Sequence, residues 1–453
     1  MVNKRSIYGT LLSLTIPIAI QQLFVSGLGM VDMMLVGQLG DTAVAAVGLA
    51  TQVYFILSLL YFGMSSGSAI FTAQFWGKQD KESIQKVLTL NLISNFTIGV
   101  LITLISQIAP QFILQLFSND PEVIRLGSQY LRIYSLGFVF LGISYAFYTV
   151  LRSTENVKIP MSVGVTILSF NTVLGFILIF GKLGLPALGV NGAAIANATS
   201  RFLELIIITS IIKIRKSSVV IRPVLVFPIS SEFIKRYLTT AMPVTINELI
   251  WSLGIAAYNS IYAHIGTESI AAINIASTLE NLAFVPFIGL GNAAAIMIGK
   301  KIGANEVNDG IHSAKQIIKI SSIIAIVMGA LIFLNKNWIL DIYKISDSAK
   351  SYAHLVLIVL SIALLVKSTN LIIIIGIIRA GGDTKYGLFV ELATMWLFGV
   401  PAAYIAANVF HLPVYWVVAV IAFEEVIKLG LIIYRFHSRK WVHHLTEPFT
   451  EPA

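Results

Sequence analysis

The chain has 453 residues, of which 57% are hydrophobic and only 12% charged, and its mean hydropathy is +0.84. Soluble domains carry about a quarter charged residues, so this composition excludes an ordinary soluble protein and indicates one embedded in the lipid bilayer. The absence of cysteine excludes disulfides, thiolate metal sites and cysteine nucleophiles.

Twelve apolar stretches are long enough to cross a bilayer, for which about 20 residues suffice. In chain order they are residues 8–37, 42–74, 86–108, 128–151, 160–181, 188–212, 237–263, 269–299, 314–334, 350–378, 386–409 and 412–436. The basic N-terminal residues lead directly into a full-length span, so no cleavable signal peptide is expected. The sequence therefore predicts an all-α membrane protein with twelve transmembrane helices.

The net charge of +9 orients the chain and does not indicate a nucleic-acid partner. Of the 31 Lys and Arg residues, 22 fall in the tails and connections of one side, six on the other side and three within spans. This asymmetry follows the positive-inside rule, so both termini are expected in the cytoplasm and the protein in the cytoplasmic (inner) membrane. We expect a monomer.

The chain contains an internal repeat with a shift of 226 residues, half its length. The shift places Pro17 on Pro243, Gln22 on Glu248, Gly40 on Gly266 and Gly63 on Gly289, and a shift of 227 places Arg152 on Arg379. Both halves begin on the same side, so they are parallel repeats of the kind that two-lobed transporters use. We predict two pseudo-symmetric six-helix lobes at 1–212 and 237–436, a cytoplasmic linker at 213–236 and a polar tail at 437–453.

Asp32 is the most informative single residue, because it lies in the long first apolar stretch. A carboxylate in a span costs several kcal/mol unless it is protonated, ion-bound or hydrogen-bonded. Desolvation disfavours the charged form of the carboxylate, so Asp32 could bind a proton or cation. A polar solute held by the charged form would then be released, and the two would bind at different moments. The alternative is a carboxylate that only caps the helix break near Gly37.

Other ionisable residues lie within spans and require partners. Glu248 follows Pro243, whose kink frees backbone carbonyls that suit a cation; the alternative is a structural bond, with Lys367 as the candidate partner. Lys367 and Glu280 are possible members of a charge relay. Glu391 is a further carboxylate within a span. Helical spacing favours structural pairs for Arg201 with Glu204, and a local cluster of Glu424, Glu425 and Lys428.

Flat cations bind the faces of aromatic rings. Candidates for lining a substrate cleft are Gln22, Trp251, Tyr258 and Phe284, although packing explains any one aromatic ring equally well. No GxxxxGK[ST], HExxH or GxSxG sequence occurs, so ATP hydrolysis, zinc proteolysis and lipase chemistry have no recognisable site. We expect no enzyme and no cofactor.

Three segments resemble the multidrug and toxic compound extrusion (MATE) family. They are PIAIQQLFVSGLGMVDMMLVGQLG at 17–40, LRSTENVKIPM followed by NTVLGFILIFGKLGLPALGVNGAAIAN at 171–197, and PVTINELIW at 243–251. The resemblance covers about residues 8 to 436. It implies a secondary antiporter with two six-helix lobes that exports cationic or amphipathic compounds in exchange for protons or sodium ions.

The resemblance also implies roles for single residues. Asp32 is similar to the family's first-helix aspartate, which binds the coupling cation, and Asn171 to the fifth-helix asparagine beside it; a sodium ion at these two residues is therefore possible. Glu248 is similar to the seventh-helix glutamate. Gly175 and Ser368 stand where some members have further carboxylates or an asparagine, which favours proton coupling.

Two alternatives remain open. One is a lipid-linked oligosaccharide flippase of the same superfamily, against which the excess of acidic over basic residues in the spans argues. The other is a channel or a membrane-embedded enzyme, against which the half-repeat and the missing motifs argue.

Overall fold

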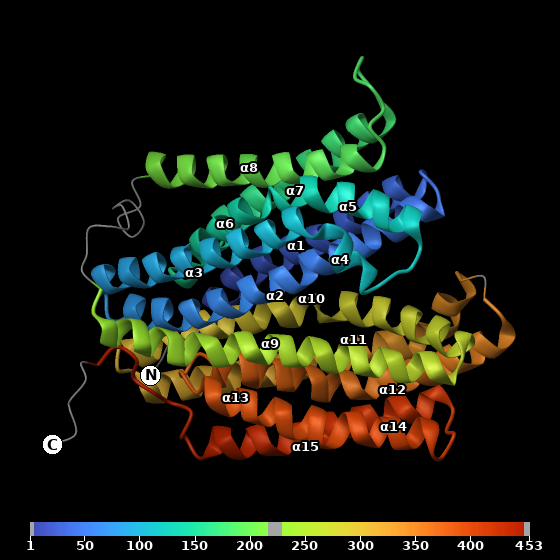
Figure 1. Cartoon of the computed structure of the whole chain (residues 1–453). Helices are drawn as coiled ribbons and strands as arrows, with labels where there is room; N and C mark the ends of the chain where they lie inside the picture. Colours follow the sequence, from blue (N-terminus) through green and yellow to red (C-terminus); the bar gives the residue numbers. More distant parts are fainter. Residues whose placement is uncertain (1–3, 216–228, 344, 448–453) are drawn as a thin grey trace. The chain divides into compact units, whose positions relative to one another are not determined.

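The computed structural model describes residues 4–215, 229–343 and 345–447, so most of the predicted linker and the last residues of the tail lie outside the described part. The first half contains α1 (Lys4–Gly37), α2 (Asp41–Gly77), α3 (Lys81–Ile108), α4 (Pro110–Gln115), α5 (Pro121–Ser135), α6 (Phe138–Ser153), α7 (Lys158–Phe180) and α8 (Val190–Ile214) (Figure 1).

The second half repeats this plan and includes two π-helical segments. It contains α9 (Ser231–Ile265), α10 (Thr267–Gly303), α11 (Val307–Asp341), α12 (Asp347–Leu371), η1 (Ile372–Ile378), α13 (Thr384–Glu391), η2 (Leu392–Gly399), α14 (Val400–Asn408) and α15 (Val414–His437). The run from α12 into η1 and the run from α13 through α14 are each one span.

Six spans in each half confirm the predicted all-α architecture. Within the described residues, nine helices are long and apolar enough to cross a membrane, and the pair α5 and α6, bent by 47°, makes a tenth. Helices α9 and α15 complete the twelve: they have 35 and 24 residues, which is sufficient length. Three charged residues, Glu424, Glu425 and Lys428, interrupt the apolar sequence of α15.

Local sequence signals explain where several helices begin. Asp80 accepts a hydrogen bond from the backbone N–H of Ser83 at the start of α3, and Ser346 accepts one from Ala349 at the start of α12. Asp120 caps α5 in the same way, just before Pro121. These caps satisfy N–H groups that have no partner within the helix.

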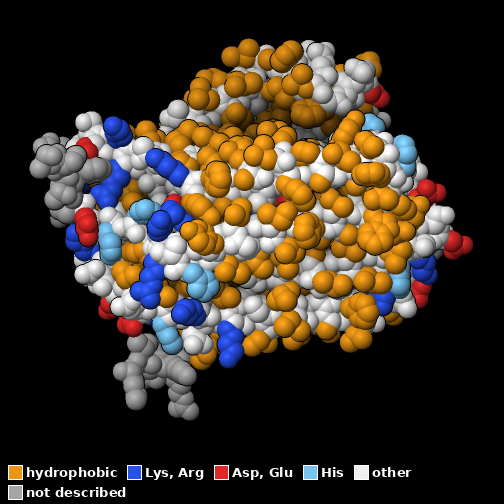
Figure 2. Space-filling view, turned by 90° about the horizontal axis from the view of Figure 1, so that it is seen from below, with side chains coloured by type: hydrophobic (Ala, Val, Ile, Leu, Met, Phe, Trp, Pro, Cys, Tyr) orange, Lys and Arg blue, Asp and Glu red, His pale blue; other side chains and the backbone are white. Residues whose placement is uncertain are grey.

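Figure 2 shows one face of the molecule, on which apolar side chains cover the middle and Lys and Arg side chains gather towards one end. Large exposed apolar residues elsewhere in the chain fit the same pattern, among them Leu101, Ile326, Leu397 and Phe423. Such side chains are stable in contact with lipid, whereas soluble proteins rarely expose them in large patches. The chain is therefore a multi-pass membrane protein.

The contacts divide the chain into two compact units. Unit 1 comprises residues 1–19 and 246–453, and unit 2 comprises residues 20–245. The two boundaries are 226 residues apart, so they fall at equivalent positions of the repeat, just after Pro17 and Pro243. They differ from the predicted lobe limits at 212 and 237, because α1 and α9 each contribute residues to both units.

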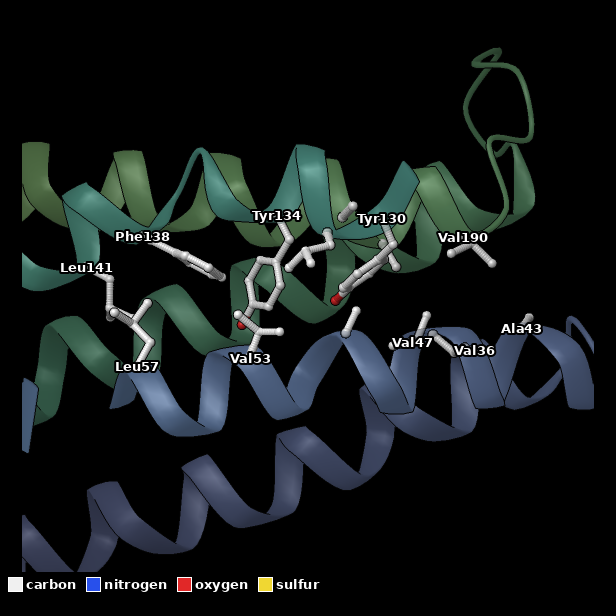
Figure 3. Close-up of a cluster of buried hydrophobic side chains, with 14 of the residues drawn as sticks. Val36, Ala43, Val47, Val53, Leu57, Tyr130, Tyr134, Phe138, Leu141 and Val190 are labelled. Carbon is white, nitrogen blue, oxygen red and sulfur yellow. The ribbon is translucent and has the colours of Figure 1, made fainter. Parts of the chain in front are cut away.

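Unit 2 has an apolar core between α2 and α5, with residues from α1, α6, α7 and α8. Figure 3 shows the side chains of Val53 and Leu57 on α2 facing Tyr134, Phe138 and Leu141. Tyr61 donates a hydrogen bond of 2.9 Å to the carbonyl of Phe138, which satisfies a buried hydroxyl. This core holds the helices that carry the polar residues described below.

Glycines allow close helix approach at equivalent places in the two units. In unit 2, a Cβ at Gly63 would collide with the backbone of Thr245 on α9. In unit 1, a Cβ at Gly289 would lie 3.0 Å from the carbonyl oxygen of Thr15 and 3.3 Å from Cβ of Ala19 on α1. Because Gly289 and Gly63 correspond in the repeat, as do Thr245 and Ala19, the duplicated halves preserve one helix crossing.

A third close approach, within unit 2, gives a test of the packing. A Cβ at Gly192 on α8 would lie 2.6 Å from the backbone carbonyl carbon of Leu178 on α7. We expect Gly192→Ala to destabilise the protein by about 1–3 kcal/mol, the usual cost of overpacking, and to lower its melting temperature in detergent. Gly48→Ala is the matched control, because a Cβ at Gly48 in α2 has nothing within 4 Å. Equal melting temperatures for the two variants would contradict this packing.

Candidate functional site: a carboxylate held by neutral donors

Asp32 is held by two neutral donors from α7. Asn171 Nδ2 donates to Asp32 Oδ2 at 2.8 Å, and Thr172 Oγ1 donates to Asp32 Oδ1 at 3.0 Å. Ser200 Oγ of α8 donates to Asn171 Oδ1 at 3.2 Å and so fixes the orientation of the amide. The predicted neighbourhood of Asp32 and Asn171 is therefore present, within unit 2.

The helices place these groups through buried apolar residues on the same faces. Val36 lies one turn after Asp32 on α1 and belongs to the core of unit 2 (Figure 3). Ile179 belongs to the same core and lies two turns after Asn171 on α7. Since residues four apart share a helix face, packing of Val36 and Ile179 turns Asp32 and Asn171 towards protein. Asp32 is half-buried rather than exposed to lipid on all sides.

No ion pair of Asp32 is found among the described residues. Arg201 of α8 is paired with Glu204 at 2.9 Å, as its spacing predicted. Tyr148 donates a further hydrogen bond of 2.7 Å to Glu204. Asp32 is thus a carboxylate solvated by neutral donors, an arrangement that can accept a proton or a monovalent cation.

Metal-binding geometry in the usual sense is not found. In the part of the chain that the structure describes, no group of three or more His, Cys, Asp or Glu side chains could hold a metal ion. At Asp32 the remaining oxygens belong to an amide and to hydroxyls, which is a weak set for a divalent cation. Gly175, where the resemblance allowed a second carboxylate, adds no ligand.

Glu248 forms an ion pair with Arg379, so the prediction that Lys367 would be its partner was wrong. Arg379 Nη2 lies 2.8 Å from Glu248 Oε1, and both side chains are buried in unit 1. Lys367 instead contacts Glu280 of α10 at 2.6 Å. Spacing along the chain does not reveal how α12 and η1 are rotated, and this rotation decides which cation faces α9.

The equivalent contact in unit 2 has the same geometry and a different charge. Arg152 Nη2 donates to Gln21 Oε1 at 2.7 Å. Arg152 corresponds to Arg379 at a shift of 227, and Gln21 is the neighbour of Gln22, which corresponds to Glu248 at the shift of 226. An arginine at the end of one span therefore binds the first span of its own repeat in both units, with an amide as acceptor in unit 2 and a carboxylate in unit 1.

The four candidate cleft residues have different surroundings. Gln22, in unit 2, is half-buried. In unit 1, Trp251 is 39% exposed and Phe284 packs edge-on against Phe287. Tyr258 is buried and bonded to Glu424 at 3.3 Å. The ring of Tyr258 thus packs inside unit 1, which argues against its expected role as a cleft-lining residue.

Sequence reasoning missed two members of the Asp32 site, Thr172 and Ser200. Thr172 follows Asn171 directly, and a hydroxyl next to a suspected ligand in an apolar span was a usable signal. Ser200 lies one turn before Glu204 on α8, and nothing local distinguishes it from other small residues in that helix. Only the tight packing of α7 on α8, which Gly192 permits, brings it to Asn171.

These features define a multi-pass membrane protein built from two repeated six-span halves, with a carboxylate in the first span that neutral donors hold. The chain belongs to the MatE family: the family model matches residues 17–177 and again 243–405. The two matches begin at Pro17 and Pro243, the positions that the 226-residue shift superimposes. The family consists of multidrug efflux transporters, which are not enzymes.

Curated relatives cover nearly the whole chain. The chain is 27% identical over 450 residues to the probable multidrug resistance protein YoeA of Bacillus subtilis, covering 97% of this chain and 95% of the relative. It is 25% identical over 421 residues to the probable multidrug resistance protein NorM of Thermotoga maritima, covering 91% and 88%.

Solved structures share the fold. A structure described as the outward-facing conformation of a multidrug resistance MATE family transporter of the MOP superfamily superimposes with a TM-score of 0.87, covering 95% of both chains at 23% identity. A mutant of the Vibrio cholerae MATE transporter VcmN gives 0.87 at 17% identity, covering 97% and 98%. These likenesses confirm the two-lobed fold of twelve helices.

The Glu248–Arg379 pair generates a stability prediction. Glu248→Ala leaves Arg379 buried without a counter-charge, which costs about 3–5 kcal/mol. Glu248→Gln is expected to lower the stability less, because a glutamine can still accept a hydrogen bond from the arginine, as Gln21 does from Arg152 in unit 2. Melting temperatures in detergent measure both, with Glu268→Ala, an exposed glutamate of α10, as the control. A melting temperature for Glu248→Ala as high as that of the control would contradict the role of the pair.

Proposed function

We propose that this protein is a secondary antiporter that exports organic cations and other amphipathic toxic compounds. Inward movement of protons or sodium ions provides the driving force, and two arrangements of the units alternately open the substrate site to the two sides of the membrane. Membership of the MATE multidrug efflux family supports the substrate class, and the relatives are named as multidrug resistance proteins. No bound organic cofactor is needed.

One observation carries the coupling role, namely that Asp32 has neutral donors and no ion pair among the described residues. A carboxylate neutralised by a fixed arginine would bind a second cation poorly, whereas Asp32 retains an unbalanced charge. A buried unbalanced charge is costly, so occupation by a proton, a sodium ion or a cationic solute is favourable. A proton or sodium ion and a cationic solute that bind the same carboxylate exclude one another. Such mutually exclusive binding is what antiport requires.

The hydrogen bonds at Asp32 provide a mechanism for proton coupling. An ionised carboxylate accepts from both Asn171 and Thr172. After protonation one carboxyl oxygen becomes a donor, and the Thr172 hydroxyl can reverse its role and accept, because a hydroxyl both donates and accepts. Protonation thus rearranges the contact between α1 and α7 and biases the equilibrium between two conformations.

Membrane potential adds to the driving force. Each charge that enters contributes about 2.3 kcal/mol per 100 mV. Since about 1.4 kcal/mol corresponds to a tenfold concentration ratio, one entering ion at about 100 mV can drive export of a neutral solute against a gradient of tens of fold. We further propose a monomer in the cytoplasmic membrane with both termini in the cytoplasm, supported by the uneven distribution of Lys and Arg.

The central test is Asp32→Asn, which removes the charge and keeps the shape. We expect a normal amount of folded protein and loss of gradient-driven efflux of a fluorescent cation such as ethidium. Asp41→Asn, at an exposed carboxylate in the first turn of α2, is the control and should transport normally. Glu248→Gln should reduce efflux only in part. Wild-type efflux by the Asp32 variant would remove this residue from the mechanism.

The coupling ion is tested in liposomes that contain the purified protein and dye. A pH gradient and a sodium gradient are applied separately, with the membrane potential clamped. We expect the pH gradient to drive dye movement, because Asp32 is the single carboxylate that the described residues bring to its site. Movement driven by sodium alone would assign Asp32 and Asn171 to a sodium site, and movement driven by neither gradient would contradict antiport.

A further inference from the structure

A second group of ionisable side chains lies inside unit 1, away from Glu248. Lys428 of α15 has three carboxylates around it: Nζ is 3.1 Å from Glu424, 3.5 Å from Glu425 and 3.4 Å from Glu391. Glu424 and Glu425 precede Lys428 by one helical turn, as the sequence predicted. Glu391 reaches the same lysine from the end of α13. We call Glu391, Glu424, Glu425 and Lys428 the Lys428 cluster.

Asn370 of α12 is bonded to this cluster, and the Lys367–Glu280 pair lies nearby. Asn370 Nδ2 donates to Glu425 Oε2 at 2.6 Å, and Lys367 lies one turn earlier on α12. The cluster and this pair, together called the network, contain four carboxylates and two ammonium groups. Two tyrosines of α9 face it: Tyr258 bonds to Glu424, and Tyr262 lies near Glu280.

The network carries more negative than positive charge when all its groups are ionised. Two lysines can balance two of the four carboxylates, so two charges remain. Glu424, Lys428 and Glu391 are 1%, 4% and 5% exposed, and unbalanced charge at such depth is strongly disfavoured. The contacts of 3.1–3.5 Å are also longer than the 2.7–2.9 Å that is usual for charged hydrogen bonds, because one lysine is shared among three partners.

Two buried oxygens of this group have no hydrogen-bond partner among the described residues. They are Oδ1 of Asn370 and Oε1 of Glu424, whose side chains are 3% and 1% exposed. Glu424 Oε1 lies 3.1 Å from Nζ of Lys428, but without the geometry of a hydrogen bond. A buried ionised oxygen that accepts no hydrogen bond is costly, and a proton bound to the carboxylate removes that cost.

The backbone around the cluster is also unusual. The π-helical segment η1 begins two residues after Asn370, which bonds to Glu425. The segment η2 begins directly after Glu391, which contacts Lys428. Single π turns within helices are rare and recur at functional sites. Gly399 at the end of η2 makes room for the group, because a Cβ there would collide with the hydroxyl of Tyr258 and lie 3.0 Å from Cγ of Glu424.

We propose that the Lys428 cluster is a second proton-binding site, which takes up and releases a proton shared among Glu391, Glu424 and Glu425. The ligand is a proton and not a metal ion, because the ammonium group of Lys428 occupies the centre at which the carboxylates converge. Glu248 cannot serve this role in unit 1 while Arg379 neutralises it. This proposal assumes the proposed antiport and extends it, because the site gives unit 1 its own response to the proton gradient.

The test uses the full-length Asp32→Asn protein in lipid nanodiscs, so that Asp32 contributes nothing. Infrared difference spectra between acid and alkaline pH record the C=O band of protonated carboxylic acids. We expect a buried carboxylic acid band that titrates, shifts in D₂O and is lost or reduced when Glu391→Gln and Glu424→Gln are added together. Glu268→Gln, at an exposed glutamate of the same unit, is the matched control and should leave this band unchanged.

Glu424→Gln alone is the second variant, in case the double substitution does not fold. It keeps two carboxylates around Lys428 and should weaken the band or shift its titration midpoint. No buried band in the Asp32→Asn protein, or a band that neither variant alters, would overturn the proposal. The outcome is independent of transport: failure of dye efflux would refute the antiporter, whereas an unaltered infrared band would refute only this site.

Discussion

The cost of an unpartnered charge in the membrane governs the arrangement of ionisable side chains in both units. Arg201 pairs with Glu204, Arg379 with Glu248 and Lys367 with Glu280, each between 2.6 and 2.9 Å. Such pairs remove the penalty of a buried charge without adding much net stability. Functional residues are therefore expected where negative charges outnumber their positive partners. This is the case at Asp32 and at the Lys428 cluster.

Duplication produced two units with one plan, and substitutions then gave them different electrostatics. The helix crossing at Gly63 recurs at Gly289, and the arginine contact of Arg152 recurs at Arg379. The acceptor is Gln21 in unit 2 and Glu248 in unit 1, so in unit 1 Arg379 neutralises the position at which the resemblance suggested a coupling carboxylate. Unit 2 instead retained an aspartate held by neutral donors. The shared scaffold positions the side chains, and the differences between the repeats decide which of them can bind an ion.

Sequence reasoning located features that depend on chain order and missed those that depend on helix rotation. Apolar length gave the spans, and helical spacing gave the pairs of Arg201 with Glu204 and of Glu424 with Lys428. The resemblance placed Asn171 beside Asp32, a contact that no spacing rule could supply. The expected partner of Glu248 was Lys367, whereas the structure pairs Glu248 with Arg379, because the directions of these side chains depend on how the helices are rotated and packed. Glu391 was not expected in the Lys428 cluster, because it comes from another helix, α13.

Helices α1 and α9 each contain a proline and each contribute residues to both units. Asp32 lies on α1, whose first residues belong to unit 1, and Glu248 and Tyr258 lie on α9, whose first residues belong to unit 2. A rearrangement of α1 at Asp32 is thus connected through one continuous helix to the opposite unit. Pro17 and Pro243 lie close to the boundaries, where each removes one backbone hydrogen bond and makes bending less costly. In the proposed antiport, protonation at Asp32 would act on α1, a helix that contributes residues to both units.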